Sequence, residues 1–159
     1  MKFTSSEIKM FNLADYPHHL EQVAEWCFNE WSKASGSTLD DVIYRTRHAT
    51  KRDGVPQTWI ALKGDELVGT FALWNNDFGN RQDLSPWIAC VYVKPEYRGK
   101  GIGTLMTQKG IELVRSMKYK KLYLITDHEG FYEKSGWKFM EIASLKGGKT
   151  TRIYEYDLA

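Results

Sequence analysis

Apolar residues recur at helical spacing in the N-terminal part of the chain. Between positions 20 and 31 they are three or four residues apart, so they share one face of a helix that starts at Asp15-Tyr16-Pro17 and ends before Ser35-Gly36-Ser37. A second helix is predicted from Leu39 to His48. Thr38 is its N-cap, and Asp41 stands three residues further on, as in a capping box.

Short apolar runs bounded by turn residues predict strands in the rest of the chain. A weak alternation around Ile8 and Met10 suggests an edge strand, and clearer strands are predicted at 58–62, 66–74, 87–93, 121–126, 137–145 and 150–158. A helix from 102 to about 117 connects strand 87–93 to strand 121–126, which is typical of a right-handed parallel crossover. A polar loop covers 75–86, and a short helix covers 131–135. The prediction is one mixed α/β domain over residues 1–159.

The segment between strand 87–93 and the following helix is rich in glycine and basic residues. Lys94-Pro95-Glu96-Tyr97 is followed by Arg98-Gly99-Lys100-Gly101-Ile102-Gly103. The first N–H groups of a helix lack intrahelical partners and carry partial positive charge, so such a helix start can hold an anion. The glycines allow a ligand to approach the backbone closely, and the two basic side chains add full charge. The sequence therefore predicts pyrophosphate binding.

Two better-known phosphate loops do not match this segment. A P-loop needs Gly-Lys-Ser/Thr at the start of the helix, but Lys100 is followed by Gly101. A dinucleotide fingerprint needs Gly-x-Gly-x-x-Gly, but position 104 is threonine, and no acidic residue ends the next strand at the required spacing. What remains is Arg-x-x-Gly-x-Gly after an apolar strand and Lys-Pro.

That arrangement resembles the acetyl-CoA-binding motif of the GNAT superfamily of N-acetyltransferases, over the run from Val91 to Gly103. The segment Phe131-Tyr132-Glu133-Lys134-Ser135-Gly136-Trp137 is similar to a second family segment, Phe-Tyr-Glu-Lys-x-Gly-Phe. The order of elements also resembles the GNAT fold, in which a bulge splays the central strand from its parallel neighbour. The resemblance covers about residues 56–158, and the two N-terminal helices agree with the family in type only.

The resemblance implies acetyl-CoA as co-substrate and no metal. The pantetheine arm would lie along the central strand, and the turn would wrap the pyrophosphate. The cofactor-binding residues expected on this basis are Val91, Tyr92, Val93, Arg98, Gly99, Lys100, Gly101, Ile102, Gly103 and Thr104. One departure from the family is that Thr126-Asp127-His128-Glu129-Gly130 lacks the asparagine that often contacts the cofactor.

The implied reaction is direct attack of a primary amine on the acetyl carbonyl through a tetrahedral intermediate. A backbone N–H near Val91 would stabilise the oxyanion. Tyr132 occupies the position of the family's general acid, and a phenol stays protonated at neutral pH. The base is less clear. His128 has a suitable intrinsic pKa, Asp83 is a second candidate, Asp127 and Glu129 are others, and a water chain is an alternative.

Selection of the acceptor amine is expected from the N-terminal helices and from the loop before the central strand. Aromatic and acidic side chains suit a cationic amine by cation–π attraction and ion pairing. Candidate wall residues are Trp26, Trp31, Tyr44, Trp74, Phe78, Asp83 and Trp87, and the segment Asp83-Leu84-Ser85-Pro86-Trp87 is expected to shape the pocket. The acceptor could be a small molecule or a peptide terminus.

Composition and charge set outer limits to this interpretation. The formal net charge of +2 is too small to argue for nucleic acid, and no run has the length of a membrane span or the form of a signal peptide, so a cytoplasmic protein is expected. Cys27 and Cys90 fall in apolar elements and are expected to be buried thiols. The edge of the final hairpin could pair with a second copy, which would give a homodimer.

Two other functions fit the same residues. One is an acyl-CoA-binding regulatory module of the same fold that does not turn over its ligand. The other is an interaction protein whose basic turn docks phosphorylated partners.

Overall fold

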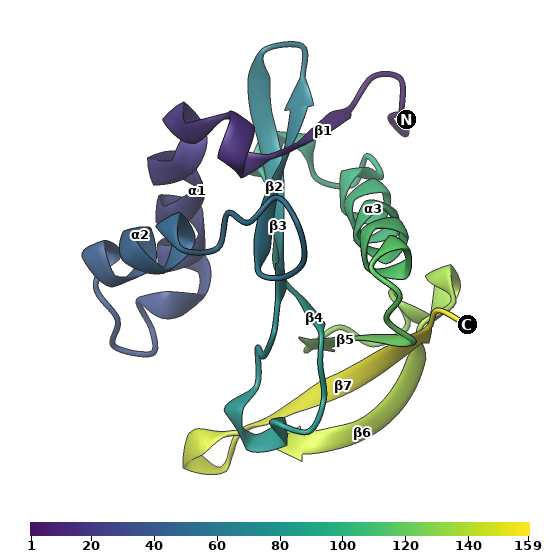
Figure 1. Ribbon diagram of the computed structural model, residues 1–159. Coiled ribbons are helices and arrows are strands. Elements are labelled where there is room, and N and C mark those ends of the chain that lie inside the picture. The colour runs from purple at the N-terminus through teal and green to yellow at the C-terminus, as the bar shows by residue number, and fades with distance from the viewer.

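The computed structural model describes residues 1–159, and all its strands belong to one seven-stranded sheet in the order β1-β2-β3-β4-β5-β7-β6 (Figure 1). Only β4 and β5 are parallel; every other neighbouring pair is antiparallel. The strand bounds are Lys9–Asn12 for β1, Gln57–Lys63 for β2, Glu66–Trp74 for β3, Trp87–Val93 for β4, Lys121–Thr126 for β5, Lys138–Ser144 for β6 and Thr150–Asp157 for β7. The predicted mixed sheet is confirmed.

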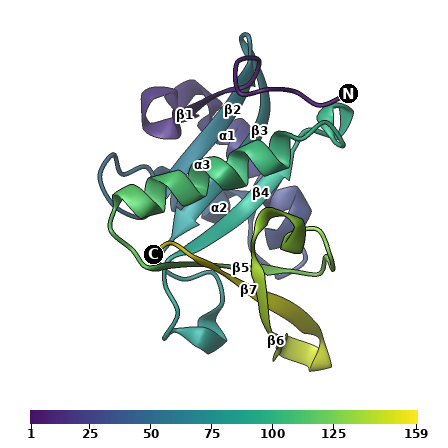
Figure 2. The ribbon, with the colours of Figure 1, turned by 90° about the vertical axis from the view of Figure 1, so that its right-hand side faces the viewer.

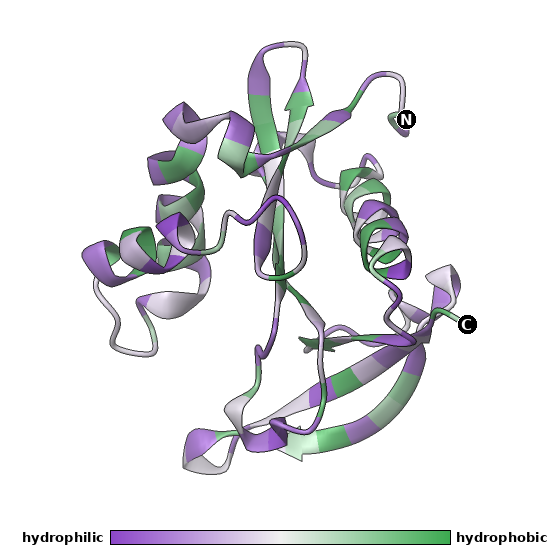
Figure 3. Ribbon diagram, in the orientation of Figure 1, coloured by the Kyte–Doolittle hydropathy of each residue, from purple (hydrophilic) through white to green (hydrophobic).

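Helices cover both faces of the central strands. Helices α1 (Leu20–Cys27) and α2 (Leu39–Arg47) lie on one face, and α3 (Ile102–Ser116) crosses the other, as Figures 1 and 2 show. Figure 3 shows both hydrophobic and hydrophilic residues along α1 and α3. This mixture is expected of amphipathic helices that pack one face on a sheet and expose the other to solvent. No helix combines the length and the apolar character that crossing a membrane requires.

The first helix begins later than the sequence predicts. Residues 13–19 form two 3-10 turns, and the regular helix starts at Leu20 and continues as a π-helix over Phe28–Ser32. Asn12 accepts a hydrogen bond from Ala14 N–H and so caps the first turn instead. The second helix matches the prediction, since Thr38 and Asp41 form the expected capping box.

A bulge in β4 separates it from β5. The β3–β4 register shifts between Thr70 and Ala72, and Cys90 has a left-handed backbone with φ of 53°. Beyond the bulge, Val91 and Val93 pack with the core on the α3 side, whereas Cys90 packs with the α1 and α2 residues. The parallel pairing with β5 is limited to Trp87 and Tyr123. The predicted splayed parallel pair is therefore confirmed.

The largest core cluster lies between α3 and the sheet. Helix α3 comes close to the strands at Gly110, where an added Cβ atom would lie 2.8 Å from Ile88 Cδ1. The loop between β3 and β4 belongs to a second cluster. In it Phe78, Leu84 and Trp87 pack against Ala143 of β6 and Ile153 of β7. This anchoring directs the loop toward the C-terminal strands.

Candidate active site

The start of α3 presents a run of backbone amides without partners. Gly99 and Gly101 have φ of 76° and 87°, and no side chain caps the helix. Leu105 is the first residue of this run whose backbone N–H makes a helical hydrogen bond, which it donates to Gly101 O at 3.1 Å. A Cβ atom on Gly103 would meet nothing within 4 Å. The amides from Gly99 to Thr104 are therefore free to bind an anion, and the space beside Gly103 is open.

Arg98 is placed differently from the other turn residues. Its backbone N–H donates to Pro95 O at 3.3 Å, and its Nε donates to Val93 O at 2.8 Å. Its guanidinium carbon lies 5.2 Å from the centre of the Tyr92 ring, which faces α1. The backbone N–H of Arg98 is therefore not free to bind a ligand, and the guanidinium charge of Arg98 lies toward the α1 side of the sheet.

The N-terminal segment adds a cation that sequence reasoning missed. Phe3 N–H donates to Lys100 O at 2.8 Å, which holds the segment against the turn. Lys2 Nζ then lies 3.4 Å from Gly99 O, and its Cδ would be 3.3 Å from a Cβ atom on Gly101. Lys2 shows no spacing signal in the sequence, because this contact depends on how β1 approaches α3.

Tyr132 lies on the α3 side of the sheet, packed against the same core cluster as Val91 and Val93. Its ring meets that of Trp137 edge-on at 6.0 Å between centroids and lies 6.1 Å from that of Tyr154. Burial raises the pKa of the Tyr132 phenol. Glu133 anchors the segment by accepting hydrogen bonds from Tyr154 Oη and Gly130 N–H. The phenol is therefore held in its protonated form against the core on the α3 side of the sheet.

The predicted aromatic residues of the first helix meet Tyr92 on the opposite face. The Trp26 ring lies 4.9 Å from the Tyr92 ring, and Trp31 approaches it edge-on at 6.5 Å. Trp31 is 42% exposed, and Trp26 is half-buried. These rings form an accessible aromatic surface, next to the bulge of β4, that suits a cationic amine.

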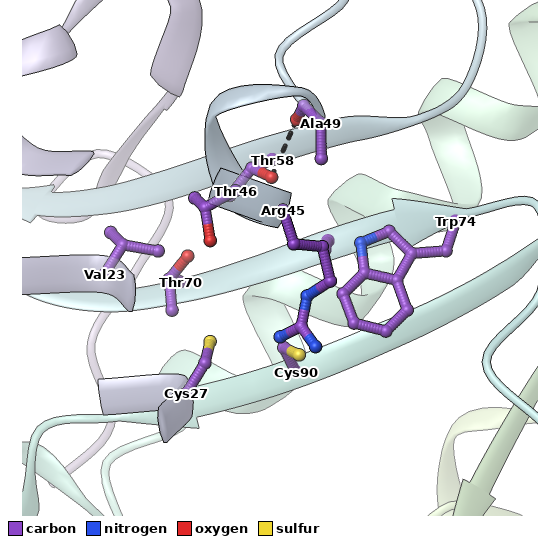
Figure 4. A pocket seen from close by; sticks show the side chains of 10 residues that line it. Val23, Cys27, Arg45, Thr46, Ala49, Thr58, Thr70, Trp74 and Cys90 are labelled. Carbon is purple, nitrogen blue, oxygen red and sulfur yellow. Dashed lines mark hydrogen bonds between the residues drawn. The ribbon is translucent and has the colours of Figure 1, made fainter. Parts of the chain in front are cut away.

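A pocket lies beside this surface, between α1, α2 and strands β2 to β4 (Figure 4). The Arg45 guanidinium points toward Cys90 and lies 4.7 Å over the Trp74 ring. Cys27 and Cys90 are both free thiols. The hydrogen bond with Cys27, together with burial, raises the pKa of the Cys90 thiol well above its usual range. Tyr44, also predicted here, is 65% exposed on α2, and its ring lies tilted against that of His48, 4.6 Å away between centroids.

Three of the predicted acceptor residues lie elsewhere. Trp87 is fully buried, and its indole N–H donates to Leu84 O at 2.6 Å, while Phe78 is buried beside it. Asp83 is exposed and accepts two hydrogen bonds of 2.9 Å from Arg81, which lower the pKa of its carboxyl. The segment was expected to shape the pocket, but its apolar residues pack on β6 and β7.

The other base candidates are exposed. His128 lies in the loop after β5, where its backbone N–H donates to Thr126 Oγ1 at 3.1 Å and its ring lies 6.1 Å from that of Phe131. Glu129 pairs with Arg152 at 3.4 Å. None of these contacts connects them to the pocket beside Cys90.

This fold and this turn define a GNAT-type acetyltransferase. The chain matches the model of the Acetyltransferase (GNAT) family over residues 19–137 and belongs to that family. It is similar to N-alpha-acetyltransferase 30 of Schizosaccharomyces pombe, with 29% identity over 85 residues, which cover 50% of this chain and 56% of that protein. The chain thus spans little more than half the length of this curated relative.

Solved structures agree with this assignment of the fold. An aminoglycoside 6'-N-acetyltransferase complexed with coenzyme A has a TM-score of 0.74 at 17% identity, over 96% of this chain and 97% of that chain. Aminoglycoside 6'-acetyltransferase type Ii has a TM-score of 0.72 at 20% identity, over 96% of this chain and 97% of that chain. A GNAT family acetyltransferase from Elizabethkingia anophelis with acetyl-CoA bound gives 0.63 at 16% identity, over 95% and 98%.

Proposed function

We propose that the protein is an acetyl-CoA-dependent N-acetyltransferase that acts on a primary amine of a small molecule or peptide. The observation that carries the proposal is the run of unpartnered amides from Gly99 to Thr104, at the end of a splayed strand. Such amides suit the pyrophosphate of coenzyme A, and Lys2 and Lys100 supply cations nearby. The relatives with coenzyme A or acetyl-CoA bound support the same ligand.

The splayed edge of β4 would hold the rest of the co-substrate. Backbone groups of Val91 to Val93 are not fully engaged by β5, since Trp87 and Tyr123 are the only residues paired between the two strands. The pantetheine amides would add to this edge much as a peptide strand adds to a sheet. Holding the thioester and the amine in attack geometry can supply on the order of 7–11 kcal/mol of the barrier.

The reaction divides among few groups. The amide near Val91, just after the bulge, would stabilise the charge that develops on the carbonyl oxygen. Tyr132 would give a proton to the departing sulfur, which its raised pKa allows at neutral pH. Trp26, Trp31 and Trp74 would receive the acceptor. His128 and Asp83 stay predictions for the general base. Both side chains are exposed, which supports this role less than a buried position would.

The acceptor classes follow from charge and from the relatives. A cationic amine suits the aromatic surface around Tyr92. One relative is named an N-alpha-acetyltransferase and two structural neighbours are named aminoglycoside 6'-acetyltransferases, so peptide termini and aminoglycosides are the first acceptors to test.

A thiol-release assay tests the proposal. Acetyl-CoA would be incubated with the protein and, in separate reactions, with an aminoglycoside, a polyamine and a peptide with a free N-terminus. Amine-dependent thiol release that decreases in the Tyr132→Phe variant is expected. Binding of acetyl-CoA with no amine-dependent release would instead favour the non-catalytic regulatory module.

A further inference from the structure

The pocket between α1, α2 and strands β2 to β4 contains one charged side chain. Arg45 of α2 is the only basic residue among those that line it, and no aspartate or glutamate lines it. The Arg45 guanidinium points toward Cys90, the bulge residue of β4, and lies 4.7 Å over the Trp74 ring (Figure 4). The pocket is therefore positively charged next to the strand that would hold the thioester.

The hydrogen-bond donors of this pocket differ in whether the protein uses them. The hydroxyls of Thr46, Thr58 and Thr70 all donate to backbone carbonyl groups, at 2.7–2.8 Å. The Arg45 guanidinium and the Trp74 indole N–H have no hydrogen-bond partner in the protein, and Arg45 forms no ion pair. Arg45 is exposed, so solvent and ligands can reach it. These two donors are therefore left for a ligand.

Most other arginines of the chain have a partner within the protein: Arg52, Arg81, Arg98, Arg115 and Arg152. Arg45 and Arg47 have none, although both belong to α2. Only Arg45 lines the pocket, where attraction to the Trp74 ring holds its guanidinium in place. Arg47 is exposed and does not line the pocket, which makes it a matched control.

A carboxylate matches the donors that are left. A guanidinium presents parallel N–H groups that fit the two oxygens of a carboxylate, and the indole N–H of Trp74 can add a third hydrogen bond. The apolar walls of the pocket strengthen such a charge pair. A polycation would instead meet two like charges, since Arg98 also lies on this side of the sheet, 5.2 Å from the Tyr92 ring.

We propose that Arg45 and Trp74 bind a carboxylate of the acceptor, so that the acceptor is an amine that also carries a carboxylate, such as a free amino acid. This inference rests on the proposed acetyl transfer and narrows its acceptor class. Cys90 precedes Val91, whose amide would stabilise the carbonyl oxygen. A carboxylate on Arg45 would therefore bring a nearby amine toward the thioester.

The carboxylate takes no part in the exchange of bonds. The neutral amine forms the N–C bond with its lone pair, and the electron pair of the breaking C–S bond stays on sulfur, which takes a proton from Tyr132. The nitrogen loses its extra proton to solvent, and solvent returns one to Tyr132. The products are the N-acetylated amino acid and coenzyme A as a thiol.

The test compares free amino acids with their amides, in which a neutral group replaces the carboxylate. The pairs are alanine, methionine, phenylalanine and β-alanine with the corresponding amides, and kanamycin A and spermidine are acceptors without a carboxylate. Thiol release at saturating acetyl-CoA and about pH 8 gives kcat/KM for each acceptor. Wild type should show a larger kcat/KM for at least one of the amino acids than for kanamycin A or spermidine.

Replacing Arg45 should remove the contribution of the carboxylate. Arg45→Gln should lower kcat/KM for that amino acid by about 10-fold or more and change it for the amide by less than about twofold. Because amidation lowers the pKa of the neighbouring amine, the decisive quantity is the change in the acid-to-amide ratio between wild type and variant. Arg45→Lys, which keeps the charge but not the planar fork, should recover part of the ratio. Arg47→Gln should keep the wild-type ratio.

The outcomes separate this inference from the proposed function. An acid-to-amide ratio that is unchanged in Arg45→Gln, or that falls equally in Arg47→Gln, overturns the carboxylate site while leaving acetyl transfer intact. A wild type that acetylates kanamycin A or spermidine but none of the amino acids does the same. A wild type that binds acetyl-CoA but acetylates none of the acceptors overturns the proposed function and this inference with it.

Discussion

Replacing Gly103 with valine should separate coenzyme A binding from the stability of the fold. Gly103 has an ordinary helical backbone, unlike Gly101, and a Cβ atom there would meet open space. Valine is more favourable than glycine in a helix by a few tenths of a kcal/mol (about 0.3). Without ligand, the variant should therefore unfold at the same temperature as wild type or slightly above it.

The loss of ligand affinity should be much larger than this gain. The added side chain would occupy the space in front of the free amides of Ile102 to Thr104. If it removes two charge-assisted hydrogen bonds of about 1.5 kcal/mol each, Kd rises by roughly 100-fold or more. At a coenzyme A concentration of 100 times the wild-type Kd, wild type gains about 2.7 kcal/mol and the variant about 0.4. For a domain of this size, that is a shift of about 5–11 °C against about 1–2 °C.

Thermal unfolding with and without coenzyme A measures both effects. Gly79→Val is the matched control, because Gly79 also has an ordinary backbone and open surroundings but lies in the loop before β4. It should keep the full ligand-induced shift. A Gly103→Val variant that keeps the wild-type shift would refute the placement of the pyrophosphate on this turn.

Four other changes have defined outcomes. Tyr132→Phe should lower kcat by about 10² or more at unchanged acetyl-CoA affinity, measured by thiol release and calorimetry; full activity would remove the acid role. Trp26→Ala should raise the KM of a cationic acceptor severalfold, because it removes the ring that packs against Tyr92, without changing the Kd of coenzyme A. Lys2→Ala should raise the Kd of coenzyme A a fewfold in calorimetry, and the difference should shrink in high salt; equal values at low salt would contradict its contact with the turn. Asp77, in the loop after β3, is half-buried without a hydrogen bond or ion pair, and burial raises the pKa of its carboxyl to about 7. Asp77→Asn should therefore stabilise the fold at neutral pH by at most about 4 kcal/mol, as judged by urea denaturation.

The sign of the Asp77 effect follows from its raised pKa. Between the unfolded pKa of about 4 and the folded value of about 7, the native state holds a proton that the unfolded state has lost. Asp77 therefore lowers stability progressively as the pH rises through this window, and the loss is complete above it. The difference between wild type and Asp77→Asn should grow from about pH 4 to about pH 7. A difference that is constant with pH would contradict the raised pKa.

Local patterns were enough to predict the central unit of the fold. Strands Glu66–Trp74, Trp87–Val93 and Lys121–Thr126 have the predicted bounds, because each is an apolar run between turn residues. The glycine turn was also visible, since positive φ at Gly99 and Gly101 is a local requirement. The start of the first helix was missed because Asn12 caps an earlier 3-10 turn.

The parts of the site that depend on long-range packing could not be inferred from the sequence. Asp83, Pro86 and Trp87 form a segment that suggested an acceptor pocket. In the structure, Trp87 is buried against Ala143 of β6 and Ile153 of β7, and Arg81 binds the carboxylate of Asp83.

Calorimetric titration with coenzyme A and with pantetheine, which lacks the pyrophosphate, tests the central claim most directly. If the amides from Gly99 to Thr104 bind the pyrophosphate, coenzyme A should bind, and pantetheine should bind at least about 100-fold more weakly. Equal affinity for the two compounds, or no heat with either, would contradict the account.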